Sequence, residues 1–118
     1  MNLGHLLPRS PTDLSSGEKQ KVAIASILIL DPEILVLDEP LANLDPHTAT
    51  QIIDLLVELN RSSGKTIIIA EHRLQYLLEA ASHLLLLQDG KKKEYGDLKH
   101  TLCRSSLYQS GVDLPPIF

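Results

Sequence analysis

The sequence has one cysteine, Cys103, among its 118 residues. A single cysteine cannot form a disulfide within the chain, so we expect it to work in a reducing compartment. No apolar stretch approaches the roughly 20 residues that a membrane-spanning helix needs. The N-terminus also lacks the charged-then-apolar pattern of a signal peptide. These absences predict a cytosolic protein without a membrane span of its own.

The sequence also lacks an excess of positive charge. It has 11 Lys and Arg against 15 Asp and Glu, a formal net charge of −4. Binding to a nucleic-acid backbone needs clustered positive charge, and the only basic run, residues 91–93, is typical of a solvated strand end. We therefore expect no nucleic-acid partner. The hydrophobic content, 43% of this short chain, suits one globular domain.

The first chemically informative segment is Leu14-Ser15-Ser16-Gly17-Glu18. Ser15 suits the N-cap of a helix, and Glu18 three residues later completes a capping box. Backbone amides at such a helix start point outward, where they and the helix dipole can bind an anion. Ser15 can add its hydroxyl, and Gly17 lets the backbone approach a phosphate closely. An ordinary capped helix is the alternative, and this segment alone favours it.

The second segment is an apolar run at residues 34–37 that is followed by Asp38 and Glu39. A continuous apolar run is typical of a parallel strand buried on both faces, and α/β proteins place their chemistry where such strands end. Adjacent strand residues point to opposite faces, so the two carboxylates are expected to differ in role. Asp38 suits Mg²⁺ bound through a water, and Glu39 suits orienting or deprotonating an attacking water. A strand end leading into a polar turn is the alternative.

The rest of the chain alternates predicted strands and helices. The first helix is expected to run toward Leu30, and Asp45-Pro46 starts a second helix that Gly64 ends in the left-handed conformation. Further elements are expected at residues 66–70 (a buried strand), 73–81 (a short helix), 84–87 (a strand) and 91–95 (a strand), the last two joined by an Asp89-Gly90 turn. This order predicts an α/β fold with a mostly parallel sheet flanked by helices.

Two polar segments follow the predicted strands. Glu71-His72 come after residues 66–70, where His72 suits a hydrogen bond to a transferred phosphoryl group, with a structural role as an equal alternative. Asn43-Leu44-Asp45 follow the carboxylates, and their simplest interpretation is a loop with an N-cap.

One segment imitates a phosphate-binding loop. Gly64-Lys65-Thr66 has the ending of such a loop, but Leu59 stands where its first glycine belongs. A helix precedes this segment and a strand follows it, the reverse of the order that the loop requires. We therefore reject this interpretation.

Taken in order, Leu14 to Glu18, Leu35 to Pro40, Ala42 to Asp45 and Glu71-His72 resemble the ATP-binding-cassette (ABC) ATPases. The match covers essentially the whole chain and corresponds to the C-terminal half of such a nucleotide-binding domain. Residues 15–21 and 69–74 look most like the ATPases of energy-coupling-factor (ECF) importers of vitamins and transition metals. The resemblance implies a partial P-loop NTPase fold that lacks the half with the Walker A loop.

The resemblance also implies a role for each motif residue. Leu14, Ser15, Ser16, Gly17 and Glu18 match the signature motif, which would bind ATP held by a second subunit; Ser16 replaces a glycine and Glu18 a glutamine. Residues 34–38 match Walker B, with Asp38 for Mg²⁺. Glu39 matches the catalytic glutamate, His72 the switch histidine, and Asn43, Leu44 and Asp45 the D-loop. Glu18 adds negative charge near the phosphate site unless it points back to cap the helix.

One ABC ATPase domain is expected to contain all of residues 1–118. Residues 1–33 would end its helical subdomain, residues 34–95 would form the core with Walker B, D-loop and switch histidine, and residues 96–118 would form a tail. The implied cofactors are ATP and Mg²⁺. The implied partners are a second ABC ATPase subunit in a head-to-tail dimer and a transmembrane transporter subunit. The implied location is cytoplasmic, peripheral at the inner face of the cell membrane.

The implied function is that of an ATP-binding subunit, here a fragment, which couples ATP hydrolysis to import of a vitamin or metal ion. Because the sequence shows no Walker A loop, we expect an inactive chain unless another polypeptide completes it, as in a truncated, split or mis-started gene product. The alternative is a non-catalytic dimerisation or regulatory fragment. An ATPase of DNA maintenance is less favoured, because the net charge opposes it.

The same resemblance predicts a gap in the sheet. The Walker A strand of such folds lies between the strands expected here at residues 66–70 and 84–87. Without it both strands expose backbone edges, which promote association. We therefore expect the isolated chain to be marginally stable or to associate.

Overall fold

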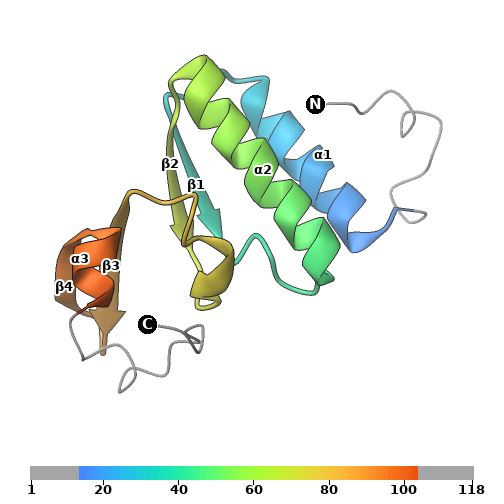
Figure 1. Ribbon diagram of the computed structural model, residues 1–118. Helices are drawn as coiled ribbons and strands as arrows, with labels where there is room; N and C mark the ends of the chain where they lie inside the picture. The colour runs from blue at the N-terminus through green and yellow to red at the C-terminus, as the bar shows by residue number, and fades with distance from the viewer. Residues whose placement is uncertain (1–13, 104–118) are drawn as a thin grey trace. The chain divides into compact units, whose positions relative to one another are not determined.

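A computed structural model describes residues 14–103, which divide into two units between Glu71 and His72 (Figure 1). The first unit contains α1 (Ser16–Leu28), β1 (Ile34–Asp38), α2 (Pro46–Ser63) and β2 (Thr66–Ala70). The second contains the 3₁₀ helix η3 (Leu74–Tyr76), β3 (His83–Gln88), β4 (Lys91–Asp97) and α3 (Leu98–Leu102). Expectations for residues 1–13 and 104–118 lie outside the described residues.

Strands β1 and β2 form a parallel pair with α2 as the crossover between them. Ile34 lies opposite Thr66 and Asp38 opposite Ala70, so the two strands end level with each other. A parallel pair needs such a crossover, because its strands run in the same direction. The arrangement confirms the predicted α/β class and brings the residues after both strands to one edge of the sheet.

Both helix starts of the first unit follow the sequence prediction. The Ser15 hydroxyl accepts a hydrogen bond from the Glu18 amide at 3.2 Å, and the Glu18 carboxylate accepts one from the Ser15 amide at 3.3 Å. This reciprocal pair is the predicted capping box. Asp45 caps α2, with Pro46 as its first residue. Each cap satisfies amides that have no partner within their own helix.

The helix ends agree with the prediction at Gly64 and differ slightly at α1. Gly64 has φ 65°, the left-handed conformation expected at a C-terminal cap. Helix α1 ends at Leu28, two residues before the expected Leu30. The amide of Leu30 donates to the carbonyl of Ile27 and that of Asp31 to Leu28, so the last turn tightens before Pro32.

The core of the first unit lies between the helices and one face of the strand pair. Helix α2 contacts both α1 and β2, and Figure 1 shows the two helices on the same side of β1 and β2. The core residues of α2 recur every three or four positions, which puts them on one helical face. They are Ala49, Ile52, Ile53 and Leu56.

The opposite face of this strand pair is open, so the prediction of strands buried on both faces is wrong. Leu35 is 1% exposed, whereas its neighbours Ile34 and Val36 are 57% and 66% exposed. In β2, Ile68 is 52% exposed. Successive strand residues point to opposite faces, and within residues 14–71 the helices cover only one of them. Apolar residues therefore occupy both faces although only one is buried.

The second unit contains an antiparallel hairpin whose register runs from His83 opposite Asp97 to Gln88 opposite Lys91. The turn residues Asp89 and Gly90 both have positive φ, 52° and 73°. This geometry matches the twist of the flanking strands and confirms the predicted turn. Helix α3 packs on the hairpin.

The helix expected at residues 73–81 is not formed, and the 3₁₀ helix η3 and a turn stand there instead. The amide of Leu77 donates to the carbonyl of Leu74, and that of Ala80 to Leu77, which is the tighter i to i−3 spacing. Arg73 at the start makes no side-chain cap. Without a cap, the segment has little local stabilisation for a regular helix start.

Within residues 14–103 the strands form two separate two-stranded sheets, and no pairing joins β2 to β3. The gap expected between residues 66–70 and 84–87 stays a prediction. None of the helices in this part of the chain has the length and apolar character to cross a membrane.

Candidate functional site

Residues 14–18 at the start of α1, here called the signature turn, form a mostly polar and exposed surface. Ser15 and Ser16 are exposed, Leu14 and Glu18 are half-buried, and Gly17 is buried. Among residues 14–103, no acceptor contacts the amides of Ser16 and Gly17, whereas the capping box satisfies those of Ser15 and Glu18. These amides and the helix dipole favour an anion here.

The carboxylate of Glu18 is directed to the cap. Its Oε1 accepts the hydrogen bond from the Ser15 amide, so the side chain points back toward the helix start. This is the orientation in which Glu18 can replace the usual glutamine while making the same kind of capping contact. The negative charge that Glu18 introduces in place of a glutamine therefore lies at the helix start, where the Ser15 amide and the helix dipole stabilise it.

Gly17 lies where α1 packs closely against α2. A Cβ atom built on Gly17 would overlap the Cγ2 methyl of Thr48, well inside the 3.0 Å that real Cβ atoms keep. Gly17 is therefore needed for the packing of the two helices, in addition to any approach of a phosphate. The sequence reasoning did not find this contact.

Thr48 also completes the cap of α2. Its Oγ1 donates to Asp45 Oδ1 at 2.5 Å, and its amide donates to Asp45 Oδ2 at 3.1 Å. The side-chain bond first, and then the backbone bond, lower the pKa of Asp45 below its ordinary 3.8. A Thr three residues after an Asp N-cap is a sequence signal that would have pointed to this side chain.

The three D-loop residues have different environments. Asn43 is exposed and has φ 61°, a left-handed conformation that Asn adopts more readily than most residues. Leu44 is buried, and its amide donates to the carbonyl of the fully buried Leu41 at 3.2 Å. Asp45 caps α2. Asn43 and Asp45 are thus both exposed, but the carboxylate of Asp45 is engaged in the cap of α2, and the buried Leu44 anchors the loop.

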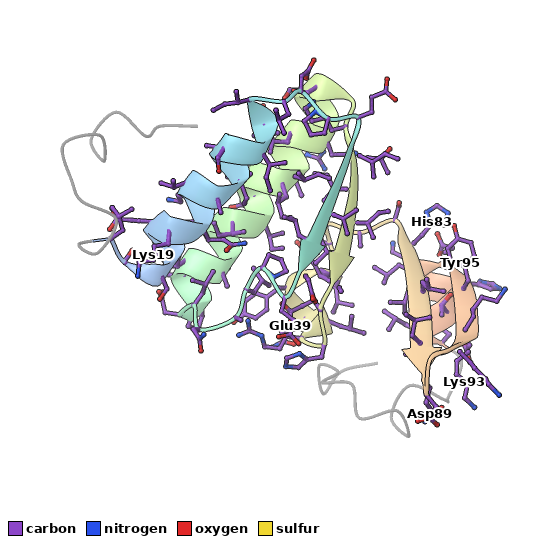
Figure 2. The ribbon with its side chains drawn as sticks, turned by 180° about the vertical axis from the view of Figure 1, so that it is seen from behind. Lys19, Glu39, His83, Asp89, Lys93 and Tyr95 are labelled. Carbon is purple, nitrogen blue, oxygen red and sulfur yellow. The ribbon has the colours of Figure 1, made fainter. Side chains whose placement is uncertain are left out.

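The two carboxylates stand at the carboxyl end of β1, where Figure 2 labels Glu39. Asp38 is exposed on the same face as Ile34 and Val36. Glu39 lies one residue beyond the strand with φ 47° and is also exposed. The alternation rule, which predicts opposite faces for the two side chains, does not apply to Glu39 because its left-handed backbone turns the chain.

The backbone of Glu39 is held at both ends. Its amide donates to the carbonyl of Ala70 at 2.8 Å, which extends the β1–β2 ladder, and its carbonyl accepts from the amide of Ala42 at 3.1 Å. A left-handed residue other than glycine costs about 1–2 kcal/mol. Such strain gathers at functional sites, where the surrounding structure maintains it. Asp31, Asn43 and Asp89 share this conformation, and the catalytic role of Glu39 stays a prediction.

The donors present fit Mg²⁺ only as part of a nucleotide complex. Within residues 14–103, no three His, Cys, Asp or Glu side chains form a cluster that could hold a metal ion. Mg²⁺ keeps several waters and is bound through one or two carboxylates together with substrate phosphates. The exposed carboxylate of Asp38 at the strand end meets that requirement.

His72 is the first residue of the second unit and is exposed. Its carbonyl accepts a hydrogen bond from the amide of Leu74 at 3.2 Å, which leads the chain into η3. It follows the end of β2 by two residues, as the sequence predicted. Its catalytic role stays a prediction.

Lys65 has a structural role. Its ammonium donates to Asp31 Oδ1 at 2.8 Å and to the carbonyl of Pro32 at 2.7 Å, which ties the start of β2 to the chain before β1. The hydrogen bond and charge of Lys65 lower the pKa of Asp31. With α2 before it and β2 after it, Gly64-Lys65-Thr66 is confirmed not to be a phosphate-binding loop.

A parallel strand pair with a helical crossover, two carboxylates at its end and a capped helix start with outward amides are features of a nucleotide-binding α/β domain. A family model described as "AAA domain, putative AbiEii toxin, Type IV TA system" matches residues 1–79.

Relatives in the curated proteins are ATP-binding subunits of transporters. A putative ABC transporter ATP-binding protein of Vibrio vulnificus is 47% identical over 98% of this chain and 20% of its own length. The energy-coupling factor transporter ATP-binding protein EcfA2 of Mycoplasmopsis synoviae is 47% identical over 93% of this chain and 35% of its own. The nickel import ATP-binding protein NikO of Rhodobacter capsulatus is 44% identical over 96% and 45%. The chain thus spans less than half of each relative.

Solved structures agree with these relatives. A nucleotide-free ATP-binding cassette from an ABC transporter superposes with a TM-score of 0.85 at 29% identity, over 95% of this chain and 46% of that one. The cbiO1 protein of Clostridium perfringens, part of the transporter complex cbiONQ, gives 0.73 at 35% identity, over 83% and 39%. A bacterial ABC transporter cassette solved as a dimer gives 0.67 at 33% identity, over 76% and 38%. The chain belongs to the family of ABC transporter ATP-binding cassettes and represents part of one cassette.

Proposed function

We propose that the chain supplies the signature, D-loop and Walker B part of an ABC transporter ATPase subunit that couples ATP hydrolysis to the import of a vitamin or metal ion. The observation that carries this proposal is the first unit, which places an exposed helix start and the Asp38–Glu39 strand end on one folded body. Import and its cargo are supported by relatives named for energy-coupling-factor transport and nickel import.

The signature turn would bind the terminal phosphate of an ATP molecule held by a second subunit. The amides of Ser16 and Gly17 would donate to the phosphate. The Ser15 hydroxyl already accepts the Glu18 amide, which leaves its own hydrogen for a phosphate oxygen. Leu14 and Glu18 would support the turn from either side, and Asn43 would face the second subunit. A dimeric structure of a related cassette supports this pairing.

The strand end would serve the chain's own nucleotide. Asp38 would hold Mg²⁺ through a water, and the ion would neutralise charge on the phosphates. Glu39 would orient and deprotonate the attacking water, and His72 would donate a hydrogen bond to the transferred group. A transmembrane subunit would use the resulting cycle at the inner face of the cell membrane, as the membership of cbiO1 in a transporter complex suggests.

The test is to co-express the chain with the part of a related cassette that it does not span and to measure Mg²⁺-dependent ATP hydrolysis. Glu39→Gln is expected to lower the rate by about 100-fold or more, the usual contribution of a general base. Glu58→Gln, at an exposed position on α2, is the matched control and should leave the rate unchanged. Hydrolysis that does not depend on Glu39, or that does not exceed that of the separate parts, refutes the proposal.

The second candidate is a non-catalytic fragment that caps an intact cassette. It is favoured by one observation: the residues that would act on a partner's nucleotide, Ser15 to Gly17 and Asn43, share the first unit with no need of the second. The chain is then expected to inhibit the ATPase of an intact related cassette when titrated into it. No inhibition, together with hydrolysis after co-expression, favours the catalytic role.

A further inference from the structure

Two motifs that lie far apart in the sequence meet at one side chain, Thr48. The three heavy atoms nearest to a Cβ built on Gly17 all belong to Thr48, with its Cγ2 methyl first. The Thr48 hydroxyl, which is bonded to the same Thr48 Cβ as that methyl, donates to Asp45 Oδ1 at 2.5 Å. Gly17 is part of the signature turn, and Asp45 is part of the D-loop.

The two contacts of Thr48 depend on the same torsion. Cγ2 and Oγ1 are both bonded to Cβ, so a rotation about χ1 moves them together, and the side chain of Thr has few alternative rotamers. A shift of α1 toward Cγ2 could be relieved by rotation only if Oγ1 left Asp45. The position of the signature turn and the cap of α2 are therefore linked.

The D-loop conformation depends on that cap. Asp45 also accepts the Thr48 amide at 3.1 Å, and the buried Leu44 precedes it directly. If Asp45 were released from Thr48, the exposed Asn43, whose φ is 61°, would lose one of the two supports that hold its loop. A change at Gly17 can thus reach Asn43 through Thr48 and then Asp45, which lies two residues further along the same loop.

We propose that Thr48 is a positioning residue that couples the signature turn to the D-loop, so that a displacement of α1 by a nucleotide phosphate changes the loop presented to the second subunit. The inference rests on the proposed function, because it takes the signature turn as the site of phosphate contact. Thr48 itself touches neither nucleotide nor water in this scheme.

The coupling predicts different effects for the Cγ2 methyl and the Oγ1 hydroxyl of Thr48, and four variants distinguish them. Gly17→Ala introduces the Cβ that overlaps Cγ2. Thr48→Ser removes the methyl and keeps the hydroxyl. The double variant Gly17→Ala with Thr48→Ser should restore space and cap together. Thr48→Val keeps the methyl shape and removes the hydroxyl. Thr50, an exposed neighbour on α2 whose Oγ1 donates to the carbonyl of Pro46 at 3.0 Å, provides the control Thr50→Ser.

Two measurements apply to each variant of the full chain. The first is binding to an intact related cassette with a non-hydrolysable ATP analogue present. Gly17→Ala and Thr48→Val are expected to weaken it by on the order of tenfold, the size of one lost hydrogen bond to a charged group, because the Thr48 amide still donates to Asp45. Thr48→Ser and Thr50→Ser should bind like the unmodified chain, and the double variant should bind more tightly than Gly17→Ala. The second is the pKa of the Asp45 carboxyl by NMR, which should rise toward 3.8 in Gly17→Ala and Thr48→Val only.

The outcomes separate this inference from the proposed function. If the unmodified chain does not bind the cassette, the proposed function fails, and the Asp45 titration by itself decides whether Thr48 links the two motifs. If the double variant is as impaired as Gly17→Ala, or if Gly17→Ala leaves the Asp45 pKa unchanged, the coupling is refuted. If Gly17→Ala unfolds the chain, folding of the double variant supports the inference and its failure to fold overturns it.

Discussion

Neighbouring residues of β1 should respond very differently to substitution, because this strand is buried on one face only. Val36 is 66% exposed and Leu35 is 1% exposed. Full burial of such a side chain contributes about 1.5–3 kcal/mol. Val36 retains about a third of its burial, so about 0.5–1 kcal/mol depends on its apolar character. Val36→Thr keeps the β-branched shape and should cost no more than that.

Leu35→Ala is the matched comparison on the buried face. Removing a buried leucine side chain costs about 2–5 kcal/mol, because the transfer free energy is lost and a cavity remains. If β1 were buried on both faces, Val36→Thr would bury a hydroxyl and cost a further 1–3 kcal/mol or so. The difference between the two variants therefore measures which face of the strand pair is covered.

Urea denaturation followed by circular dichroism gives the free energy of unfolding of each variant, provided the slope with urea is unchanged. Sedimentation at several concentrations gives self-association, which Val36→Thr should reduce because it removes part of an exposed apolar face. One-sided burial of β1 is refuted if Val36→Thr destabilises the chain as much as Leu35→Ala. A cooperative, strictly monomeric unfolding transition would also contradict the expected tendency to associate.

Three further results are expected. Gly64→Ala should lower the free energy of unfolding by about 1 kcal/mol, because φ is 65° and no atom lies within 4 Å to compensate; an unchanged urea midpoint would contradict this. Glu39→Gly should be more stable than Glu39→Ala by about 1 kcal/mol, because only glycine relieves the left-handed strain, although the proposed function predicts that both variants lose hydrolysis. Lys65→Met should reduce the loss of stability between about pH 5 and pH 2. The pKa of Asp31 is depressed by Lys65, so its contribution exists above the unfolded pKa and disappears as pH falls through the folded one; equal pH profiles would refute this role.

Local features were predicted well because each depends on residues close in the sequence. The capping box of Ser15 and Glu18, the Asp45 cap and the left-handed Gly64 all satisfy backbone groups within one turn of themselves. The hairpin turn at Asp89-Gly90 is equally local. Candidate site residues came from the same reasoning and from the resemblance to ABC cassettes. The relatives bear out that family, and the roles of the site residues stay predictions.

Features that depend on long-range contacts were missed. The apolar run at residues 34–37 predicts a strand, but the sequence does not say which face a helix will cover, and β1 is open on one side. The close packing of Thr48 on Gly17 joins residues 31 positions apart, and the Lys65–Asp31 pair joins residues 34 apart. The helix expected at residues 73–81 is a local exception: the segment has no side-chain cap at Arg73, and η3 stands there instead.

The sequence by itself determined the family, the helix caps and the turns, because hydrogen bonds within a few residues and the order of motifs decide them. It also predicts which residues are offered to a phosphate and a cation. Only the tertiary structure decided that Gly17 packs on Thr48, that Glu39 takes a left-handed conformation under the hold of Ala70, and that one face of β1 is open. Those outcomes depend on which helix or strand lies opposite a residue, and close packing between distant segments sets that.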